Sequence, residues 1–210
     1  MANRSCAALF GASLGLGGCG ADKEAVAELS RAERLDPASC AGCHPAQYRE
    51  WSGSMHAYAA EDPVFRAMNA YGQRVTDGAL GDFCVQCHAP VALAEGTTFD
   101  GENLDEVPPN LRGVTCTACH QIDSVNAAHN NDTTWQPDAW FRGAFESPVP
   151  SPAHGHQYSA LHDRDRKASA SMCGSCHDVV TPAGIHLERT YGEWQDATIE
   201  ASEQEPATGQ

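Results

Sequence analysis

A pattern of five residues occurs four times in this chain and constrains its fold more than any other feature. Each copy has two cysteines separated by two residues, with a histidine directly after the second cysteine. The copies are Cys40–His44, Cys84–His88, Cys116–His120 and Cys173–His177. They account for eight of the ten cysteines, and the remaining two lie near the N-terminus at Cys6 and Cys19. The pattern therefore leaves no cysteine pair beyond residue 19 for a disulfide.

C-x-x-C-H is the attachment pattern of c-type haem. Two thiols at this spacing reach the two vinyl groups of one porphyrin, and the adjacent histidine binds the iron from the proximal side. Paired C-x-x-C turns can also bind zinc, and a single one can be a redox dithiol, but neither site requires the histidine. We therefore expect four covalently bound haem c groups. The thioether residues are Cys40, Cys43, Cys84, Cys87, Cys116, Cys119, Cys173 and Cys176, and the proximal ligands are His44, His88, His120 and His177.

The composition agrees with a core built from cofactor. Leu, Ile, Val and Phe make up 31 of 210 residues, and the formal net charge is −15. A chain so acidic and so poor in aliphatic side chains normally stays disordered, unless something else supplies the core. We expect a mainly α fold with long irregular loops and little or no β structure, wrapped around a tetrahaem core. The acidity excludes general nucleic-acid binding, and no run of 18 apolar residues indicates a transmembrane helix.

The N-terminus has the pattern of an export signal. Arg4 precedes a short apolar stretch, residues 7–16, which ends in Leu16-Gly17-Gly18-Cys19. This ending resembles the lipobox of bacterial lipoproteins, in which the cysteine is lipidated, although an ordinary cleaved leader remains an alternative. We expect residues 1–18 to be a lipoprotein-type signal peptide, 19–38 a tether, 39–194 the tetrahaem domain and 195–210 a disordered tail. The protein would then be exported to the periplasm or outer membrane and anchored to the membrane through lipid on Cys19.

Local patterns predict short helices separated by loops. Tyr48, Trp51, Met55 and Tyr58 lie on one face of a helix that begins near Pro45. Further helices are expected after Asp62-Pro63, from about residue 164 into the fourth motif, over 24–35 and over 187–197. Residues 95–112 and 130–157 are rich in Gly, Pro, Asn and Asp, and are expected to be loops.

Six histidines outside the motifs are available as second ligands for four irons. Their number favours haems in which each iron has two histidine ligands. Methionine is the less favoured second ligand, because the methionines after residue 19 lie in helical patterns that suit packing. His56 is the strongest candidate, since it projects from the helix after the first motif. His154 and His156 compete for one role before the fourth motif. The candidate distal ligands are His56, His129, His154, His156 and His186, with His162 ranked below them.

The first motif and the residues after it, 40–57, resemble the first haem segment of the nitrifier tetrahaem cytochrome c family. The founding member of that family accepts electrons from hydroxylamine oxidoreductase. Residues 152–194 also resemble related multihaem cytochromes, in which a histidine-bearing loop precedes C-G-x-C-H-D and a T-Y-x-E-W helix follows. The resemblance implies electron transfer, mostly bis-histidine haems stacked in pairs, and the possibility of one five-coordinate haem.

Two classes of function follow from these observations. The first is a periplasmic or membrane-anchored carrier of single electrons between redox proteins, such as donor and acceptor cytochromes or a membrane oxidoreductase. The alternative is a multihaem reductase of a small nitrogen or sulfur species at a five-coordinate haem. Reductases of the nitrite type typically carry C-x-x-C-K at the catalytic haem, and this sequence has no such motif. Tyr191-Gly192-Glu193-Trp194 repeats the pattern of residues 48–51 without a histidine after it, so we expect either a shortened relative or a sequence that stops before its true end.

Overall fold

The computed structural model describes residues 28–204, with side chains up to residue 198. The expected signal peptide, the lipidation site at Cys19 and residues 205–210 lie outside this range. The α-helices are α1 (Arg31–Leu35), α2 (Pro45–Ser52), α3 (Met55–Tyr58), α4 (Pro63–Val75), α5 (Val85–His88), α6 (Pro90–Ala94), α7 (Cys116–His120), α8 (Ala170–Gly174) and α9 (Thr190–Gln204). Short 3-10 helices are η1 (Pro37–Cys40), η2 (Pro109–Leu111), η3 (Ala160–His162) and η4 (Lys167–Ser169). The expected mainly α fold with irregular connections is confirmed.

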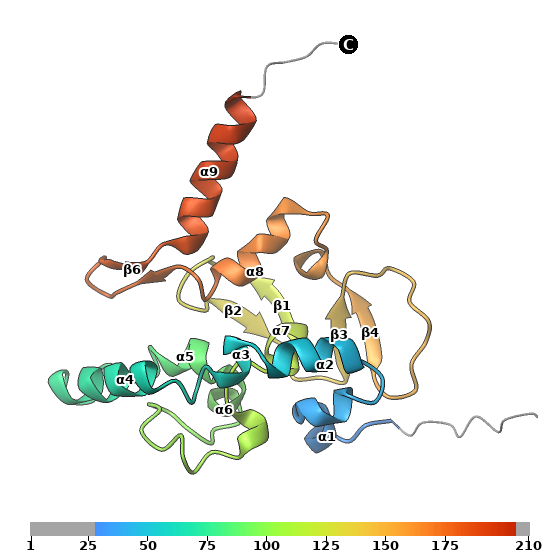
Figure 1. Cartoon of the computed structure of the whole chain (residues 1–210), viewed down its shortest axis with the longest axis horizontal. Coiled ribbons are helices and arrows are strands. Elements are labelled where there is room, and N and C mark those ends of the chain that lie inside the picture. The colour runs from blue at the N-terminus through green and yellow to red at the C-terminus, as the bar shows by residue number, and fades with distance from the viewer. Residues whose placement is uncertain (1–27, 205–210) are drawn as a thin grey trace, which may run out of the picture.

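Within residues 28–204, six short strands form three small sheets (Figure 1). They are β1 (Ile122–Val125), β2 (Thr133–Trp135), β3 (Trp140–Gly143), β4 (Gly155–Tyr158), β5 (Val179–Val180) and β6 (His186–Glu188). The pairs β1–β2 and β5–β6 are antiparallel, whereas β3–β4 is parallel. Three of these strands begin within the region expected to be loop, 130–157. Strands of two to four residues are too short to show an alternating pattern in the sequence.

The helix expected across residues 48–58 is interrupted at Gly53. α2 ends at Ser52, and a separate turn, α3, carries His56. The indole of Trp51 donates a hydrogen bond to the carbonyl of Val114 (2.8 Å), which ties α2 to the approach to the third motif. The break gives His56 a direction of its own, different from that of α2.

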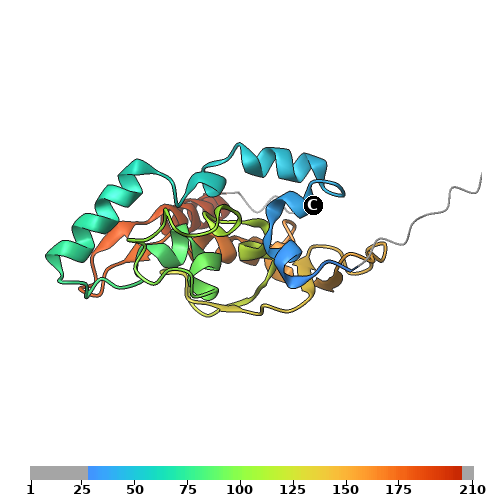
Figure 2. The same ribbon diagram turned by 90° about the horizontal axis from the view of Figure 1, so that it is seen from below.

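The helix predicted after Asp62-Pro63 is confirmed as α4. The Asp62 carboxylate accepts hydrogen bonds from the backbone N–H groups of Val64 (2.7 Å) and Phe65 (3.2 Å) and so caps the helix. Pro63 occupies the first turn, where its missing N–H has no cost. Figure 2 shows α2, α3 and α4, in blue to teal, along one side of the molecule.

The described part of the expected tether lies against the haem domain. Leu29 donates its N–H to the carbonyl of Ala153 (2.9 Å), and the Arg31 guanidinium pairs with Glu95 (2.5 Å). Leu35 is buried, and the hydroxyl of Thr117 donates to the carbonyl of Arg34 (2.7 Å). Residues 29–35 are therefore part of the packed structure.

The C-terminal helix differs from its expected position. β6 ends at Glu188, and α9 begins at Thr190 and continues to Gln204, into the segment expected to be a disordered tail. That segment is rich in Ala, Glu and Gln, which are good helix formers. Figure 1 shows α9 leading away from the other elements.

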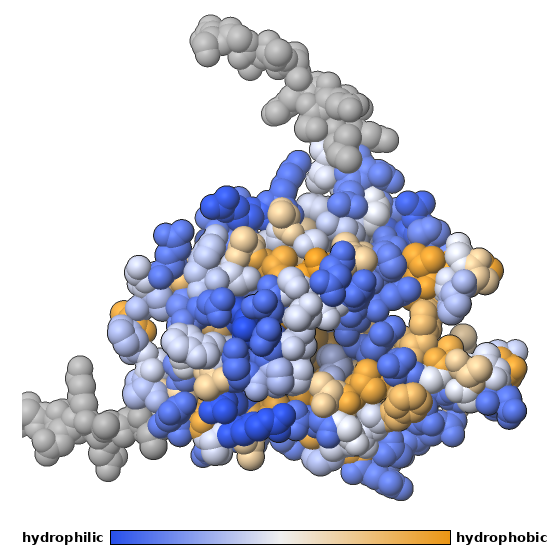
Figure 3. All heavy atoms as spheres, turned by 180° about the vertical axis from the view of Figure 1, so that it is seen from behind, coloured by the Kyte–Doolittle hydropathy of each residue, from blue (hydrophilic) through white to orange (hydrophobic). Residues whose placement is uncertain are grey.

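The apolar core is small, and alanine is its most frequent residue, followed by leucine. Its buried members are Leu35, Ala60, Phe65, Ala89, Val91, Ala92, Leu104, Val107, Leu111 and Ala118. They lie around α4 to α7, where the second and third motifs are located. Hydrophilic residues predominate on the face shown in Figure 3, with hydrophobic residues scattered among them. Within residues 28–204, no helix combines the length and apolar character needed to cross a membrane.

Candidate haem sites

The four motifs share one local geometry. In the first, second and fourth motifs, the histidine N–H donates to the carbonyl of the first cysteine at distances of 2.8, 3.3 and 2.9 Å. The third motif is entirely helical, as α7. One helical turn thus brings the first cysteine and the histidine to the same side of the backbone. This is the local arrangement that attachment of a haem to both cysteines, with the histidine under its iron, requires.

A cavity of about 380 Å³ lies at the fourth motif. Cys173, Cys176 and His177 line it from one side and His56 from α3 lines it from the other. Apolar residues make up most of the remaining wall, namely Pro90, Val91, Leu93, Ala94, Val114, Ala118, Ile122, Trp135 and Met172. A porphyrin needs an apolar enclosure with two thiols and two imidazoles directed into it, so these residues fit a haem.

The distance between the two imidazoles at this cavity also fits an iron between them. The ring centroids of His56 and His177 lie 6.1 Å apart. A metal bound to two imidazole nitrogens at about 2 Å each holds the ring centres roughly 6 Å apart. Burial, and to a lesser degree the neighbouring His177, lowers the pKa of His56, which favours the neutral form that a metal requires.

Gly113 allows the chain to approach α3 closely. Its backbone has φ = +73°, and a Cβ there would lie 2.6 Å from the carbonyl oxygens of His56 and Ala57. The next residue, Val114, donates its N–H to the carbonyl of His56 (2.8 Å). The backbone of His56 is thus held by the segment that leads into the third motif.

At the first motif, the histidine lies close to a histidine from the loop before the fourth motif. The ring centroids of His44 and His154 lie 6.3 Å apart with an interplanar angle of 30°. The Nδ1 of His154 donates to the carbonyl of Gly155 (2.9 Å), which leaves Nε2 available for a metal. His156, the competing candidate, hydrogen-bonds through Nε2 to the carbonyl of Phe145. The structure therefore brings His154, and not His156, to the first motif.

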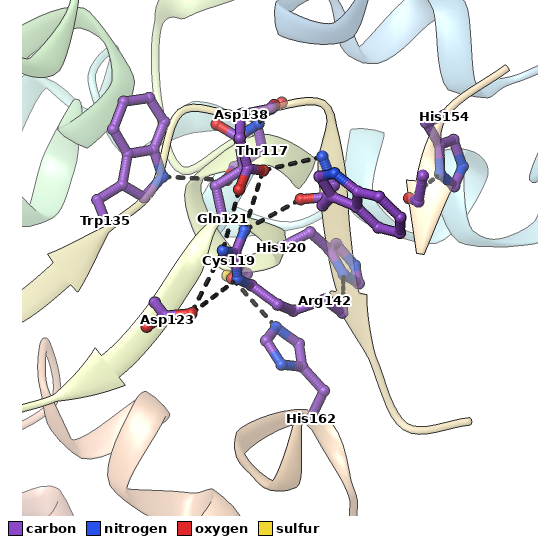
Figure 4. Close-up of polar contacts among 12 residues, drawn as sticks. Thr117, Cys119, His120, Gln121, Asp123, Trp135, Asp138, Arg142, His154 and His162 are labelled. Carbon is purple, nitrogen blue, oxygen red and sulfur yellow. Dashed lines mark hydrogen bonds and ion pairs between the residues drawn. The ribbon is translucent and has the colours of Figure 1, made fainter. Parts of the chain in front are cut away.

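At the third motif, the structure brings His120 together with His162, the histidine that the sequence ranked last. Their ring centroids are 5.2 Å apart with the planes inclined at 17° (Figure 4). His162 Nε2 contacts the carbonyl of Cys119 (3.1 Å), while its Nδ1 is buried without a hydrogen-bond partner. Burial lowers the pKa of both imidazoles. The signal that the sequence offered was weak, because His162 is the last residue of η3, a three-residue turn that is too short to show a periodic pattern.

A buried ion-pair network supports His120. The Nδ1 of His120 donates to the carbonyl of Arg142 (2.6 Å), on β3. The Arg142 guanidinium, only 4% exposed, binds both oxygens of Asp138 (3.2 Å each) and one oxygen of Asp123 (3.3 Å). It also donates to the carbonyl of Trp140 (3.0 Å). Figure 4 shows the guanidinium between the two carboxylates, beside the third motif.

The second motif differs from the other three. His88 Nδ1 donates to the carbonyl of Ala59 (3.0 Å), and the ring of Phe65 stacks on its face at a centroid distance of 3.9 Å. All ten histidines fall within the described residues, and none of the others stacks against His88. The remaining candidates, His129 and His186, are exposed and lie against no motif histidine, and His186 faces Asp178 at 3.7 Å instead.

Sulfur contacts show which motifs are neighbours. The neighbouring Cys116 raises the pKa of Cys40, and Cys40 in turn lowers the pKa of Cys116. The neighbouring Cys176 likewise raises the pKa of Cys87, and Cys87 lowers the pKa of Cys176. Burial, together with Cys176 and Cys173, raises the pKa of Cys119 to about 11. The motifs therefore follow one another in space as first, third, fourth and second.

In residues 28–198, no three His, Cys, Asp or Glu side chains converge in a way that could hold a metal ion by themselves. At the fourth motif, the cysteines and the histidine line a mainly apolar cavity.

Comparison with known proteins identifies the type of fold. Residues 39–121 match the family model of cytochrome c554 and c-prime. The structure is similar to the crystal structure of a penta-heme cytochrome c552 from Thermochromatium tepidum, with a TM-score of 0.56 and 23% sequence identity. The match covers 78% of this chain and 51% of that protein, so the chain spans about half the length of its structural relative. No curated protein matches. The chain has the fold of a multihaem c-type cytochrome.

Proposed function

We propose that this chain binds four haem c groups and carries single electrons between redox proteins. The observation that carries the proposal is the mainly apolar cavity at the fourth motif, where Cys173, Cys176 and His177 meet Cys119 of the third motif, with His56 6.1 Å from His177. When bound, each haem supplies an iron that alternates between the ferric and ferrous states. Haems attached at neighbouring motifs would lie close enough to exchange electrons. An electron would then pass from the first motif to the third, the fourth and the second, or in the reverse order.

Each part of the chain has a defined task in this proposal. The paired cysteines fix the four porphyrins, and His44, His88, His120 and His177 ligate the irons. His154 and His56 close the first and fourth haems from the opposite side, as the ring distances of 6.3 and 6.1 Å support. At the third haem the candidate is His162, whose buried Nδ1 has no hydrogen-bond partner. Apolar residues around the fourth motif keep water from the haem and so limit the reorganisation that accompanies a change of charge.

We further propose that the protein is exported and held at a membrane surface by lipid on Cys19. Its acidic surface, with a formal net charge of −15 before haem propionates are counted, favours redox partners with basic patches. Attraction of this kind is screened by salt, so the association rate with a true partner would fall as ionic strength rises.

The haem count tests the proposal directly. A pyridine haemochrome assay, normalised to chain concentration, is expected to give four haems per chain. The double variant Cys84→Ala/Cys87→Ala removes one attachment site and is expected to give three, while Cys6→Ala leaves four. Two haems or fewer in the unaltered protein would refute the tetrahaem proposal.

One observation favours a second function. Among the four motif histidines, only His88 has no second histidine beside it in the described structure. An iron ligated by His88 alone would have an open position where a small nitrogen or sulfur species could bind and be reduced. Binding of one carbon monoxide per chain after reduction, together with turnover of such a species, would favour the reductase over the carrier.

A further inference from the structure

The motif histidines and the histidines beside them differ in the acceptor to which Nδ1 donates its hydrogen bond. His88, His120 and His154 each donate to a backbone carbonyl. His177 instead contacts a carboxylate, with 3.1 Å between its Nδ1 and Oε1 of Glu188. Among the histidines with these Nδ1 hydrogen bonds, His177 of the fourth motif is therefore the one whose acceptor is a carboxylate.

Three features hold the Glu188 carboxylate in place. Glu188 is the last residue of β6 and pairs with Val179 of β5, two residues after His177. The hydroxyl of Thr190, the first residue of α9, donates to the same oxygen of Glu188 (3.0 Å). The hairpin and the start of the helix therefore aim this oxygen at the imidazole, although both side chains remain partly exposed.

A carboxylate partner changes what a metal-bound imidazole can do. When Nδ1–H donates to a carboxylate, the ring becomes a stronger electron donor than when it donates to a neutral carbonyl. A stronger donor stabilises ferric iron over ferrous iron, and hydrogen bonding to axial ligands is one of the means by which proteins set haem potentials. The negative charge near the iron acts in the same direction.

We propose that Glu188 is a positioning residue that lowers the reduction potential of the haem at the fourth motif. The proposal rests on the proposed tetrahaem function. Because the fourth motif lies between the third and the second in space, Glu188 places a low-potential haem inside the series. With haems bound, electrons would reside mainly on the haems at the third and second motifs and would pass through the fourth without accumulating there.

The test is a spectroelectrochemical redox titration of the holoprotein with Glu188→Gln, Glu188→Asp and the control Glu193→Gln. Glu193 is exposed, lies five residues further on in α9, and its substitution removes the same charge. Glu188→Gln is expected to favour reduction of one haem by about tenfold, equivalent to 59 mV for a one-electron couple. Glu188→Asp keeps the charge but shortens the side chain, so it is expected to shift the same haem by a smaller amount. Glu193→Gln is expected to leave that haem unchanged.

Electron paramagnetic resonance identifies the haem and separates ligand strength from general charge. The signal that shifts in Glu188→Gln is expected to be the low-spin signal that disappears in His56→Ala, with altered g values. No shift in Glu188→Gln, an equal shift in Glu193→Gln, or a potential in Glu188→Asp equal to that of the unaltered protein would each overturn the proposal. A count below four haems per chain would instead refute the tetrahaem function, whatever the potentials.

Discussion

The third and fourth motifs have the same five-residue pattern and the same helical turn, yet their surroundings differ. His120 donates to the backbone carbonyl of Arg142, whose guanidinium is buried and held by two carboxylates. The His177 side chain is 49% exposed and donates to the side chain of Glu188. Each environment comes from the segment that follows the motif, β3 in one case and β6 in the other. The motif determines where a haem attaches, whereas the following segment determines how the haem behaves.

The largest expected effect is on the buried network of the third motif. Arg142→Leu would leave Asp138 and Asp123 without their cation and the carbonyl of Trp140 without its donor. We expect the free energy of unfolding to fall by about 3 kcal/mol, the lower end for a broken buried pair because both carboxylates are partly exposed. Chemical denaturation of the holoprotein measures this change.

Glu188→Gln is the matched variant at the fourth motif. Because its ion pair is partly exposed, we expect a change of at most about 1 kcal/mol in the free energy of unfolding. Equal losses in the two variants would show that the two surroundings do not differ in the way the geometry indicates.

The next effect concerns the histidines opposite the two motifs. His56→Ala and His162→Ala are each expected to convert one haem from low to high spin while four haems remain attached, because each removes one axial ligand. Electron paramagnetic resonance of the oxidised protein measures the spin states. His186→Ala serves as the control, since this exposed side chain lies against no motif histidine.

Two high-spin haems in the double variant His56→Ala/His162→Ala would show that the two histidines serve different irons. If His162→Ala leaves every haem low-spin, the third haem takes its second ligand from elsewhere, and the contact between His120 and His162 is only packing.

The smallest effect is on the pH dependence of stability. Burial lowers the pKa of His120 and of His162 in the folded chain. Below about pH 6.5 the unfolded chain therefore binds more protons than the folded chain, and the free energy of unfolding falls as the pH falls. Each such imidazole contributes up to about 1.4 kcal/mol per pH unit.

Denaturation between pH 7.5 and 5.5 measures this slope, at pH values above the range in which most carboxylates titrate. His162→Asn removes one of the two groups and is expected to make the slope shallower, whereas His129→Asn, at an exposed position, leaves it unchanged. A slope unaffected by His162→Asn would contradict the burial of this imidazole.

The sequence predicted the features that depend on short, specific patterns. Four C-x-x-C-H pentads and a scarcity of large aliphatic residues led to a multihaem fold, and Asp62-Pro63 predicted the start of α4. The small sheets were missed because two to four residues are too few for a periodic pattern. The break of the helix at Gly53 was missed because the apolar spacing continues across it.

The sequence shows how many histidines are available as second ligands, but it does not show which motif each of them approaches. His56 was predicted from its place after the first motif, and the structure places it beside the histidine of the fourth motif, 121 residues further on. His162 was ranked last because its approach to His120 depends on the long-range packing of η3 against β3, which no local pattern records. His129 and His186 stay predictions without a contact that supports them.

The sulfur contacts between motifs have a consequence for how the protein is made. In a folded chain without haem, Cys40 neighbours Cys116 and Cys87 neighbours Cys176, and the neighbouring Cys87 lowers the pKa of Cys176, which favours the reactive thiolate. Oxidation of these pairs to disulfides would consume one attachment point from every motif. Premature folding would thus trap the protein in a form that can no longer be matured. We therefore expect haem attachment to precede the docking of the C-terminal half onto the N-terminal half.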